Sequence, residues 1–210
     1  MQLEPVTLSG RLVRLEPLAL HHVPALMAAA AEDRSSYRYT SVPNDVASMR
    51  SYVDTATALW DKGQALAFAT VDARSGRVVG STRFGNIEWW TWPSGAIFPP
   101  QPAGCPDAVE IGWTWLAGSA QRTGINTEAK LLMLRHAFDT WDVHRVSIRT
   151  DARNARSRAA IARLGAKLDG VLRSAQPAYD GQMHDTASYS ILRTEWPDVQ
   201  ERLQGLLRRS

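Results

Sequence analysis

The 210-residue chain has one cysteine, Cys105, and no apolar run as long as the ~18 residues that a membrane-spanning helix needs. A single cysteine excludes an internal disulfide and suits a reducing compartment. The first residues lack the basic segment and the apolar segment of a secretory signal. From these absences we expect a cytoplasmic protein that makes no membrane contact.

Several catalytic signatures are also missing. The sequence has no G-x-x-x-x-G-K-[ST] phosphate loop, no G-x-G-x-x-G dinucleotide turn and no G-x-S-x-G elbow for a nucleophilic serine. Its five histidines show no metal-ligand spacing, and Cys105 has no evident activating neighbour. Nucleotide hydrolysis, serine or cysteine nucleophiles and metal chemistry are therefore disfavoured, and we expect no metal ion.

The composition that is present is typical of a globular domain, with 44% hydrophobic and 21% charged residues. We expect one domain over 1–210, since no repeat or linker divides the chain. The net charge is only +3, but the segment 121–173 has 11 Lys/Arg against 5 Asp/Glu. Such a segment is often a solvated helix face, yet it also suits a polyanion such as a phosphorylated cofactor or nucleic acid.

Hydrophobic periodicity predicts the order of the secondary-structure elements. The expected elements are a strand at 11–17, helices at 21–31 and 44–63, strands on both sides of a turn at 73–76, a strand at 108–116, a helix at 124–141, a strand at 144–151, a short helix at 154–165, two strands and a terminal helix. This order predicts an α+β (mixed α/β) fold in which helices cover a central sheet.

The strand AVEIGWTWL at 108–116 has a simple alternating pattern. Because successive strand side chains point to opposite faces, the pattern predicts one apolar face and one polar face. The apolar face would consist of Val109, Ile111, Trp113 and Trp115, and the other face of Glu110, Gly112 and Thr114.

Residues 85–107 interrupt the pattern and hold 5 of the 11 prolines and 3 of the 8 tryptophans. A proline-rich loop of this length is more often functional or interfacial than idle. Trp89, Trp90 and Trp92 are therefore candidates to wall a substrate pocket or to seal a homodimer. Alternatively, these three side chains fold back onto the core.

The segment SAQRTGINTEAK at 119–130 leads from the strand at 108–116 directly into a helix. The first amide groups of a helix have no partner within it, and the helix dipole favours negative charge there, so such a junction can bind phosphate without a lysine. Gly124 permits close approach to the backbone, and Arg122 adds positive charge at the rim. The same features occur at any junction between a strand and a helix.

The run from VEIGWTWL through NARSRAAIARLGA resembles the GNAT superfamily of acetyl-CoA-dependent N-acetyltransferases. It is most similar to the branch of bacterial ribosomal-protein N-terminal acetyltransferases, and the match covers roughly 108–195. The resemblance implies a mixed, mostly antiparallel sheet flanked by helices, with acetyl-CoA as cofactor. The family pattern Q/R-x-x-G-x-G/A coincides with 121–126, except that Asn126 replaces the small sixth residue.

The resemblance also assigns residues to the cofactor. Backbone amides of the turn would hold the pyrophosphate, and the adjoining strand end would contact the cofactor as well. In the helix at 154–165, Asn154 would bond the pantetheine arm. The residues assigned in this way are Trp115, Leu116, Gln121, Arg122, Thr123, Gly124, Ile125, Asn126, Thr127, Asn154 and Arg156.

Two catalytic roles follow from the same resemblance. The family tyrosine that protonates the leaving thiolate is replaced by Ile161, but Ser157 matches the serine of the ribosomal branch. Glu110 would take the proton of the amine, directly or through water, with Asp151 as a weaker candidate. Alternatively, Ser157 is an ordinary first-turn residue and Glu110 only pairs with an arginine.

The predicted function is the transfer of an acetyl group from acetyl-CoA to a primary amine by direct attack, without an acyl-enzyme. The acceptor would be a protein N-terminus, a lysine or a small amine. Arg153, Arg156 or Arg158 would meet the 3′-phosphate of coenzyme A. The alternatives are a non-catalytic acyl-CoA-binding sensor or assembly module and, on the arginine cluster alone, a nucleic-acid binder.

Overall fold

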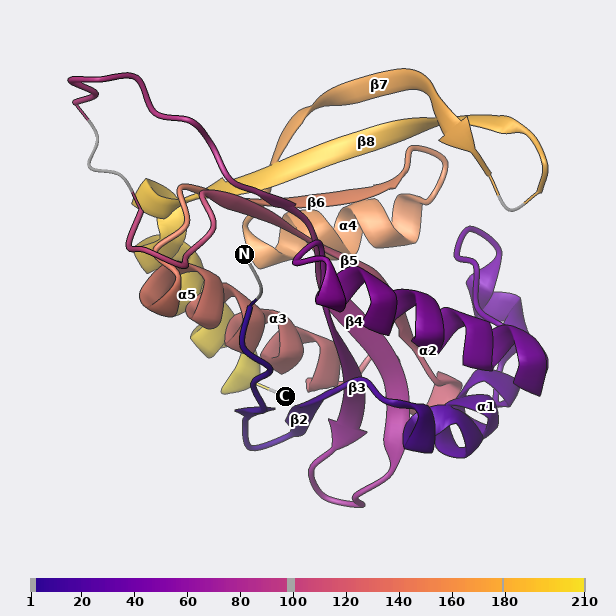
Figure 1. The fold of residues 1–210 in the computed structure, drawn as a ribbon. Coiled ribbons are helices and arrows are strands. Elements are labelled where there is room, and N and C mark those ends of the chain that lie inside the picture. Colours follow the sequence, from indigo (N-terminus) through magenta and orange to yellow (C-terminus); the bar gives the residue numbers. More distant parts are fainter. Residues whose placement is uncertain (1–2, 98–100, 179, 210) are drawn as a thin grey trace.

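The computed structural model describes residues 3–97, 101–178 and 180–209. Five α-helices and one eight-stranded sheet make up this part of the chain (Figure 1). The strands are β1 Leu8–Ser9, β2 Val13–Pro17, β3 Leu66–Asp72, β4 Val78–Glu88, β5 Ala108–Leu116, β6 Arg145–Asp151, β7 Lys167–Pro177 and β8 Met183–Leu192. The helices are α1 Val23–Ala31, α2 Val46–Asp61, α3 Ile125–Arg135, α4 Ala155–Leu164 and α5 Trp196–Leu207.

The strand order is β1-β2-β3-β4-β5-β6-β8-β7, and every neighbouring pair is antiparallel except β5 and β6. Helices α1 and α2 cover one face of the sheet, and α3 and α5 cover the other (Figure 1). Helix α4 packs against α5 and β6. The predicted mixed, mostly antiparallel sheet flanked by helices is confirmed.

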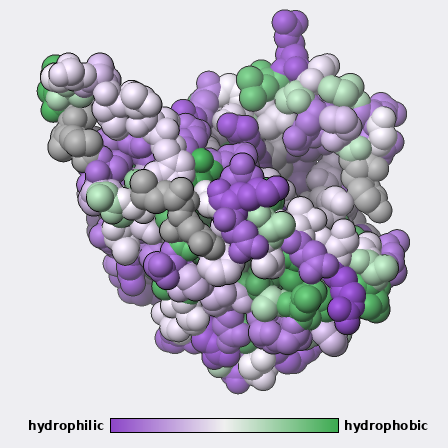
Figure 2. Space-filling view, in the orientation of Figure 1, coloured by the Kyte–Doolittle hydropathy of each residue, from purple (hydrophilic) through white to green (hydrophobic). Residues whose placement is uncertain are grey.

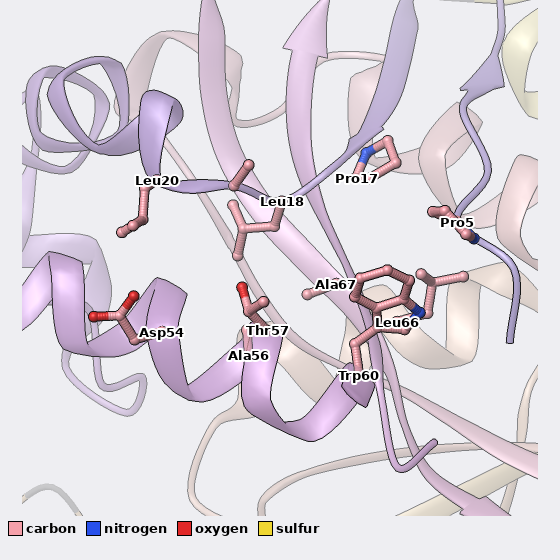
Figure 3. Close-up of a pocket in the computed structure, with 11 residues that line it drawn as sticks. Pro5, Pro17, Leu18, Leu20, Asp54, Ala56, Thr57, Trp60, Leu66 and Ala67 are labelled. Carbon is pink, nitrogen blue, oxygen red and sulfur yellow. The ribbon is translucent and has the colours of Figure 1, made fainter. Parts of the chain in front are cut away.

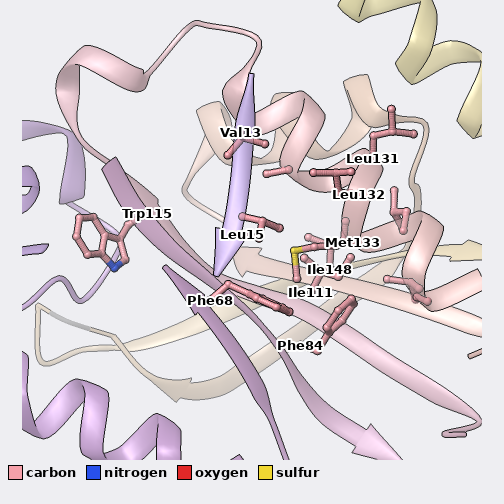
Figure 4. Close-up of a cluster of buried hydrophobic side chains, with 14 of the residues drawn as sticks. Val13, Leu15, Phe68, Phe84, Ile111, Trp115, Leu131, Leu132, Met133 and Ile148 are labelled. Carbon is pink, nitrogen blue, oxygen red and sulfur yellow. The ribbon is translucent and has the colours of Figure 1, made fainter. Parts of the chain in front are cut away.

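The core lies between the sheet and α3. Phe84 of β4 contacts the rings of Phe68 and Trp141, with centroids 6.0 and 4.8 Å away, and Met133 of α3 packs beside it (Figure 4). Burying one such side chain stabilises the fold by roughly 1.5–3 kcal/mol. Strand β5 is anchored to this core by Ile111, which pairs with Phe84 in register.

Helix ends follow the capping signals of the sequence. Asp45 caps α2 by accepting a hydrogen bond from the Ser48 amide at 2.8 Å. Asn154 caps α4 in the same way through the Ser157 amide at 3.0 Å. Helix α4 ends at Gly165, whose φ of +106° is the left-handed conformation that glycine adopts without strain. Both predicted caps of α4 are confirmed.

One carboxylate ties the N-terminal strands to α3. The buried Glu128 accepts hydrogen bonds from the backbone amides of Arg11, Leu12 and Val13 at 3.0, 2.5 and 2.8 Å. A Cβ on Gly10 would collide with this carboxylate, so the turn between β1 and β2 requires glycine there. The contact fixes the direction of β2 against the helix.

Glu128→Ala is expected to lower the free energy of unfolding by about 3 kcal/mol or more, because it leaves three backbone donors without an acceptor. Urea unfolding measures the change. Glu201→Ala, at an exposed position of α5, is the matched control and should stay within about 0.5 kcal/mol of the unsubstituted protein. A loss below about 1 kcal/mol for Glu128→Ala would show that the amides find other acceptors.

The predicted alternation of β5 is wrong beyond Gly112. Ser81 stands opposite Trp115 and Arg83 opposite Gly112, so two β5 residues, Trp113 and Thr114, face one residue of β4. This bulge reverses the alternation. Val109 and Ile111 are both buried on one face as predicted, but Trp113 is 44% exposed, Thr114 turns to α3, and Trp115 is buried against Tyr37 on the other face.

The predicted loop at 85–107 begins too early. Strand β4 extends to Glu88 and pairs Gly85 with Glu110, so the irregular segment starts at Trp89. Residues 98–100 of the predicted loop lie outside the described part of the chain. The remainder extends away from the sheet (Figure 1), and Ile97 is 97% exposed.

An apolar cavity of about 400 Å³ lies between α2 and the ends of β2 and β3 (Figure 3). Leu18, Trp60 and Leu66 line it, and none of its lining residues belongs to β5, β6 or α4. In residues 3–97, 101–178 and 180–209, no helix is long and apolar enough to cross a membrane.

Candidate active site

Strands β5 and β6 separate within the sheet. Their parallel pairing joins 108–110 to 145–147, and Glu110 is the last paired residue of β5. From Ile111 to Leu116, the edge of β5 that faces β6 pairs with no strand in the described part of the chain, so backbone groups along it are available to a ligand. The Leu116 carbonyl is an exception, because it accepts hydrogen bonds from Tyr37 and Gln121. In the space-filling view the surface is hollowed between the part that carries the β7–β8 hairpin and the part built by α1 and α2 (Figure 2). An extended molecule can therefore lie along β5.

The turn at the end of β5 has the form of an anion site. After the short 3₁₀ turn Gly118–Ala120, the chain enters α3 at Ile125 without a side-chain cap. The Ile125 amide makes only a long contact of 3.3 Å to the Thr123 hydroxyl. The first amides of α3 thus point out of the helix end, where the dipole favours negative charge. This arrangement fits a diphosphate.

One residue of this turn has a left-handed backbone. Arg122 has a φ of +60°, the left-handed conformation, whereas the buried Gly124 has an ordinary helical φ of −69°. The sharp turn therefore falls two residues before the glycine. Arg122 is exposed, so its charge is accessible to a ligand at the turn.

Asn126, the irregular residue of the sequence pattern, lies in the first turn of α3. Its Oδ1 is buried, and it has no hydrogen-bond partner in the described part of the chain. Leaving such an acceptor unpaired costs about 1–3 kcal/mol, so a bound donor or a water molecule would stabilise it. The neighbouring Thr127 is buried, and its hydroxyl accepts a hydrogen bond from Arg163 of α4 at 3.0 Å.

Gln121 and Arg156 bridge the turn to the segment that follows α1. The Gln121 amide donates to the Ser36 hydroxyl and to the Leu116 carbonyl, both at 2.9 Å. Arg156 of α4 donates to the Ser36 carbonyl at 2.7 Å and to Gln121 Oε1 at 3.3 Å. The Leu116 carbonyl also accepts from Tyr37 at 3.0 Å. These contacts hold α4 and the anion turn together.

The three candidate arginines for the 3′-phosphate differ in how their charge is balanced. Arg153 pairs with Asp151 and Asp180 at 2.7 and 2.9 Å. Arg158 donates to the Tyr189 hydroxyl and to a backbone carbonyl. Among the described residues, Arg156 and Arg158 both bond only neutral groups, so the charge of either remains available to an anion. Arg156 is favoured because it is the more exposed of the two and also bonds Gln121 of the anion turn.

The helix α4 presents its first turn to the same region. The carbonyl oxygen of the Asn154 side chain is used by the cap, and the Ser157 hydroxyl makes no hydrogen bond within the described residues. Ser157 is partly exposed, whereas Ile161, one turn further, is buried in the core. A hydroxyl donor is thus present at 157 and none at 161.

Glu110 lies at the point where β5 and β6 separate and is 6% exposed. Its Oε2 accepts a hydrogen bond from Asn86 at 2.8 Å and lies 3.5 Å from Arg149 Nε. The arginine pair expected in the alternative interpretation is therefore present, although it is long. Asp151 is a poorer base, because its hydrogen bonds with Arg153 lower the pKa of its carboxyl group.

The three loop tryptophans separate into two groups. Trp89 packs against the core, as the alternative interpretation expects. Trp90 and Trp92 surround Asp107, which accepts the Trp90 amide at 2.6 Å and the Trp92 indole at 2.7 Å. Both rings also contact His144, at 5.7 and 5.1 Å between centroids. This cluster lies where β5 and β6 begin, at the end of β5 remote from the anion turn.

Sequence reasoning did not identify Lys130, which lies on the buried side of α3. Its Nζ donates to the hydroxyls of Thr82 and Thr114 at 3.1 and 2.6 Å, and no carboxylate pairs with it in the described ranges. Burial lowers the pKa of this amine to about 7. The sequence signal that could have identified it is a lysine directly before the apolar residues of this helix.

The free energy of unfolding is expected to rise between about pH 7 and pH 9. In this window the unfolded chain keeps a proton on Lys130, since the ordinary pKa of a lysine is 10.5, while the folded chain has released it. Stability therefore increases with pH, by roughly 1.4 kcal/mol per unit. Urea unfolding of the unsubstituted protein and of Lys130→Met at both pH values measures the effect. The two proteins have the same titratable groups except Lys130, so a difference between their pH dependences comes from this residue. Parallel pH curves would contradict a neutral buried lysine.

The open edge of β5, the start of α3 without a side-chain cap and the buried Glu110 form a site that suits an extended ligand with a phosphate group. A family model described as "Acetyltransferase (GNAT) domain" matches residues 12–167. The chain belongs to the GNAT acetyltransferase family, whose members use acetyl-CoA. The family predicted from the sequence is confirmed.

Three relatives show how far the likeness extends. The chain is 34% identical over 88 residues to a Bacillus subtilis protein named "Putative ribosomal N-acetyltransferase YdaF"; the match covers 42% of this chain and 47%, about half, of that protein. A GCN5-related N-acetyltransferase from Brucella melitensis is 28% identical with a TM-score of 0.79, covering 99% of this chain and 87% of the other. RimJ of Mycobacterium smegmatis in complex with CoA-disulfide shares the fold, with a TM-score of 0.77 at 24% identity over 96% and 95% of the two chains.

Proposed function

We propose that this protein is an N-acetyltransferase that transfers the acetyl group of acetyl-CoA to a primary amine by direct attack. The observation that carries this proposal is the separation of β5 from β6 at Glu110, with the uncapped end of α3 at the other end of β5. One end of an extended donor would meet a carboxylate and the other end would meet the free amides of a helix.

The donor would be held along β5 and across the start of α3. Backbone amides between Arg122 and Thr127 would bind the diphosphate, and Arg156 would neutralise a phosphate charge. Unpaired backbone groups of β5 between Ile111 and Leu116 would bond the amide-containing arm, with the Asn154 side chain on the opposite wall. Acetyl-CoA supplies a thioester, which is activated toward an amine.

Two proton transfers would accompany the reaction, one from the amine and one to the leaving sulfur. Glu110 takes the proton that the amine loses as its nitrogen bonds to the acetyl carbon, directly or through water. As the carbon–sulfur bond breaks, the Ser157 hydroxyl would donate its proton to the sulfur and regain one from water, while Glu110 would return its proton to the solvent. Unpaired amides of β5 face the negative charge that develops on the acetyl oxygen.

Cys105 does not suit an acyl-enzyme route. Burial raises the pKa of its thiol, which disfavours the reactive thiolate. It lies in the segment between β4 and β5, at the end of β5 remote from the anion turn. Direct attack by the amine therefore needs no covalent step on the protein.

A protein N-terminus is the acceptor that we propose. The name of the Bacillus relative assigns that protein to ribosomal N-acetyltransferases. The aromatic pair Trp90 and Trp92, near the start of β5, offers an apolar surface that suits a peptide better than a polyamine. A site for polyamines would instead be expected to present several carboxylates.

Thiol release from acetyl-CoA tests the proposal. The protein is offered three acceptor sets at equal concentration: peptides with free N-termini, N-terminally blocked peptides with one lysine, and small amines. We expect turnover with the first set and little with the second. Tight acetyl-CoA binding without turnover of any amine would instead identify a non-catalytic acyl-CoA sensor, for which the absence of a tyrosine at 161 is the motivating observation.

A further inference from the structure

Arg83 of β4 is a buried cation without an acidic partner. It is 3% exposed, and in residues 3–97, 101–178 and 180–209 its side chain makes neither a hydrogen bond nor an ion pair; its Nε is completely buried. An unpaired buried charge costs several kcal/mol, so proteins rarely keep one without a partner. The free chain therefore holds a guanidinium that lacks its counter-ion.

Two aromatic rings hold this guanidinium in place. The Arg83 Cζ lies 5.1 Å from the ring centroid of Tyr52 on α2 and 4.9 Å from that of Trp113 on β5. Such contacts stabilise a cation by roughly 0.5–2 kcal/mol, which offsets only part of the cost of burial. They leave the hydrogen-bonding capacity of the guanidinium unused.

The position of Trp113 is itself costly for the chain. It occupies the bulge of β5 with a φ of +50°, which is strained for a bulky residue. Its ring lies over Gly85, where a Cβ would collide with it. Of the guanidinium nitrogens only Nε is fully buried, and the neighbouring Trp113 is 44% exposed, so a ligand would approach the two terminal nitrogens past this ring. Gly85 makes room for the Trp113 ring, and the strained backbone of Trp113 directs this ring toward Arg83.

The cation lies beside the proposed base. Gly85 pairs with Glu110 and Arg83 pairs with Gly112, so Arg83 and Glu110 are diagonal neighbours on one face of adjacent strands. They form no ion pair, since Glu110 bonds Asn86 and Arg149 instead. An amine that reaches Glu110 would place its nearest substituents next to Arg83.

We infer that Arg83, between Tyr52 and Trp113, binds a carboxylate of the acceptor and so selects amines that carry an acidic group close to the reacting nitrogen. The inference rests on the proposed function and specifies its substrate class. In a peptide the carboxylate is an acidic side chain in the first residues after the free N-terminus. A planar guanidinium binds a carboxylate through two parallel hydrogen bonds.

Two peptides that differ only in Glu or Gln at the second position test the inference. The unsubstituted protein should favour the Glu peptide in kcat/KM by about 10- to 100-fold, the value of a charge-assisted hydrogen bond. In Arg83→Met the ratio should fall to about one, because the variant keeps an unbranched side chain between the rings and loses the charge. Arg50→Met, at an exposed position of the same helix as Tyr52, is the matched control and should keep the full ratio.

A stability measurement separates binding from a structural role. Arg83→Met should unfold at the same or a higher temperature, since it removes an unpaired buried charge. A lower melting temperature together with an unchanged Glu-to-Gln ratio would overturn the inference and make Arg83 a structural residue. Turnover of both peptides at equal rates by the unsubstituted protein would also overturn it.

A binding measurement tests the carboxylate site even if the protein has no acetyltransferase activity. If no amine is turned over, calorimetric titration of the two peptides into the protein saturated with coenzyme A still compares their affinities. A preference for the Glu peptide that Arg83→Met abolishes supports the carboxylate site without catalysis. Equal affinities, or no binding of either peptide, would contradict it. A third titration, with free glutamate, shows whether a small amine suffices.

Discussion

Ser157→Ala is expected to lower kcat by about 10²- to 10⁴-fold while the affinity for acetyl-CoA changes little. This is the usual range for loss of a positioned proton donor. The Ser157 hydroxyl has no partner among the described residues, and the cap of α4 uses the backbone amide, which alanine retains. Thiol release at saturating substrate measures kcat, and calorimetric titration measures the affinity.

The control for this variant is Ser157→Thr, which keeps a hydroxyl in the first turn and should retain much of the activity. Unchanged kcat in Ser157→Ala would remove the proton-donor role and leave Ser157 as an ordinary residue of α4. A drop in affinity as large as the drop in kcat would instead place the hydroxyl in cofactor binding.

Gly124→Glu is expected to weaken acetyl-CoA binding by about 100-fold or more. The substitution places a carboxylate at the start of α3, where free amides and the helix dipole would receive a diphosphate. Loss of two charge-assisted hydrogen bonds alone accounts for that magnitude. Calorimetric titration with acetyl-CoA measures it, with the melting temperature as a check on folding.

Two further variants show whether a loss of acetyl-CoA affinity in Gly124→Glu comes from the added charge. Gly124→Ala should bind acetyl-CoA more tightly than Gly124→Glu, because the φ of −69° accepts any residue and no charge is added. Arg122→Glu reverses a charge at an exposed position and should weaken binding without loss of stability. Retained affinity in both charge variants would refute the anion site, whereas an unfolded Gly124→Glu would leave Arg122→Glu as the decisive variant.

The order of elements and the helix boundaries could be predicted because they depend on local signals. Asn154 and Gly165 bound α4 at the positions that their side chains favour, and the apolar residues of α2 recur at helical spacing. Such signals act within one or two turns of chain, so the sequence alone carries them.

The bulge of β5 could not be predicted in the same way. Alternation assumes that each residue has one partner on the next strand, and nothing in GWTWL indicates that Thr82 faces two residues. Bulky residues rarely adopt a positive φ, so the sequence did not predict one at Trp113. In the structure this conformation places the Trp113 ring beside Arg83. The sequence therefore predicted a regular strand, whereas in the structure β5 has a bulge at Trp113 and Thr114 beside the candidate site.

The charged residues inside the sheet were missed for a related reason. Arg83 lies in STRF, where an alternating pattern places it on a solvent-exposed face, and only the contact with Tyr52 of α2 shows that this face is covered. The sequence made no prediction for the left-handed conformation of Arg122 in the anion turn. The burial of Arg83 depends on contacts between distant segments, which periodicity does not report.

Acetyl transfer itself tests the proposed function most directly. The protein is incubated with acetyl-CoA labelled with a heavy isotope in the acetyl group, together with a peptide that has a free N-terminus, and the products are identified by mass spectrometry. We expect a labelled acetyl group on the α-amine of the peptide and one free thiol per acetyl group transferred. Acetyl-CoA that binds but yields no labelled peptide, or a label found only as free acetate, would contradict it.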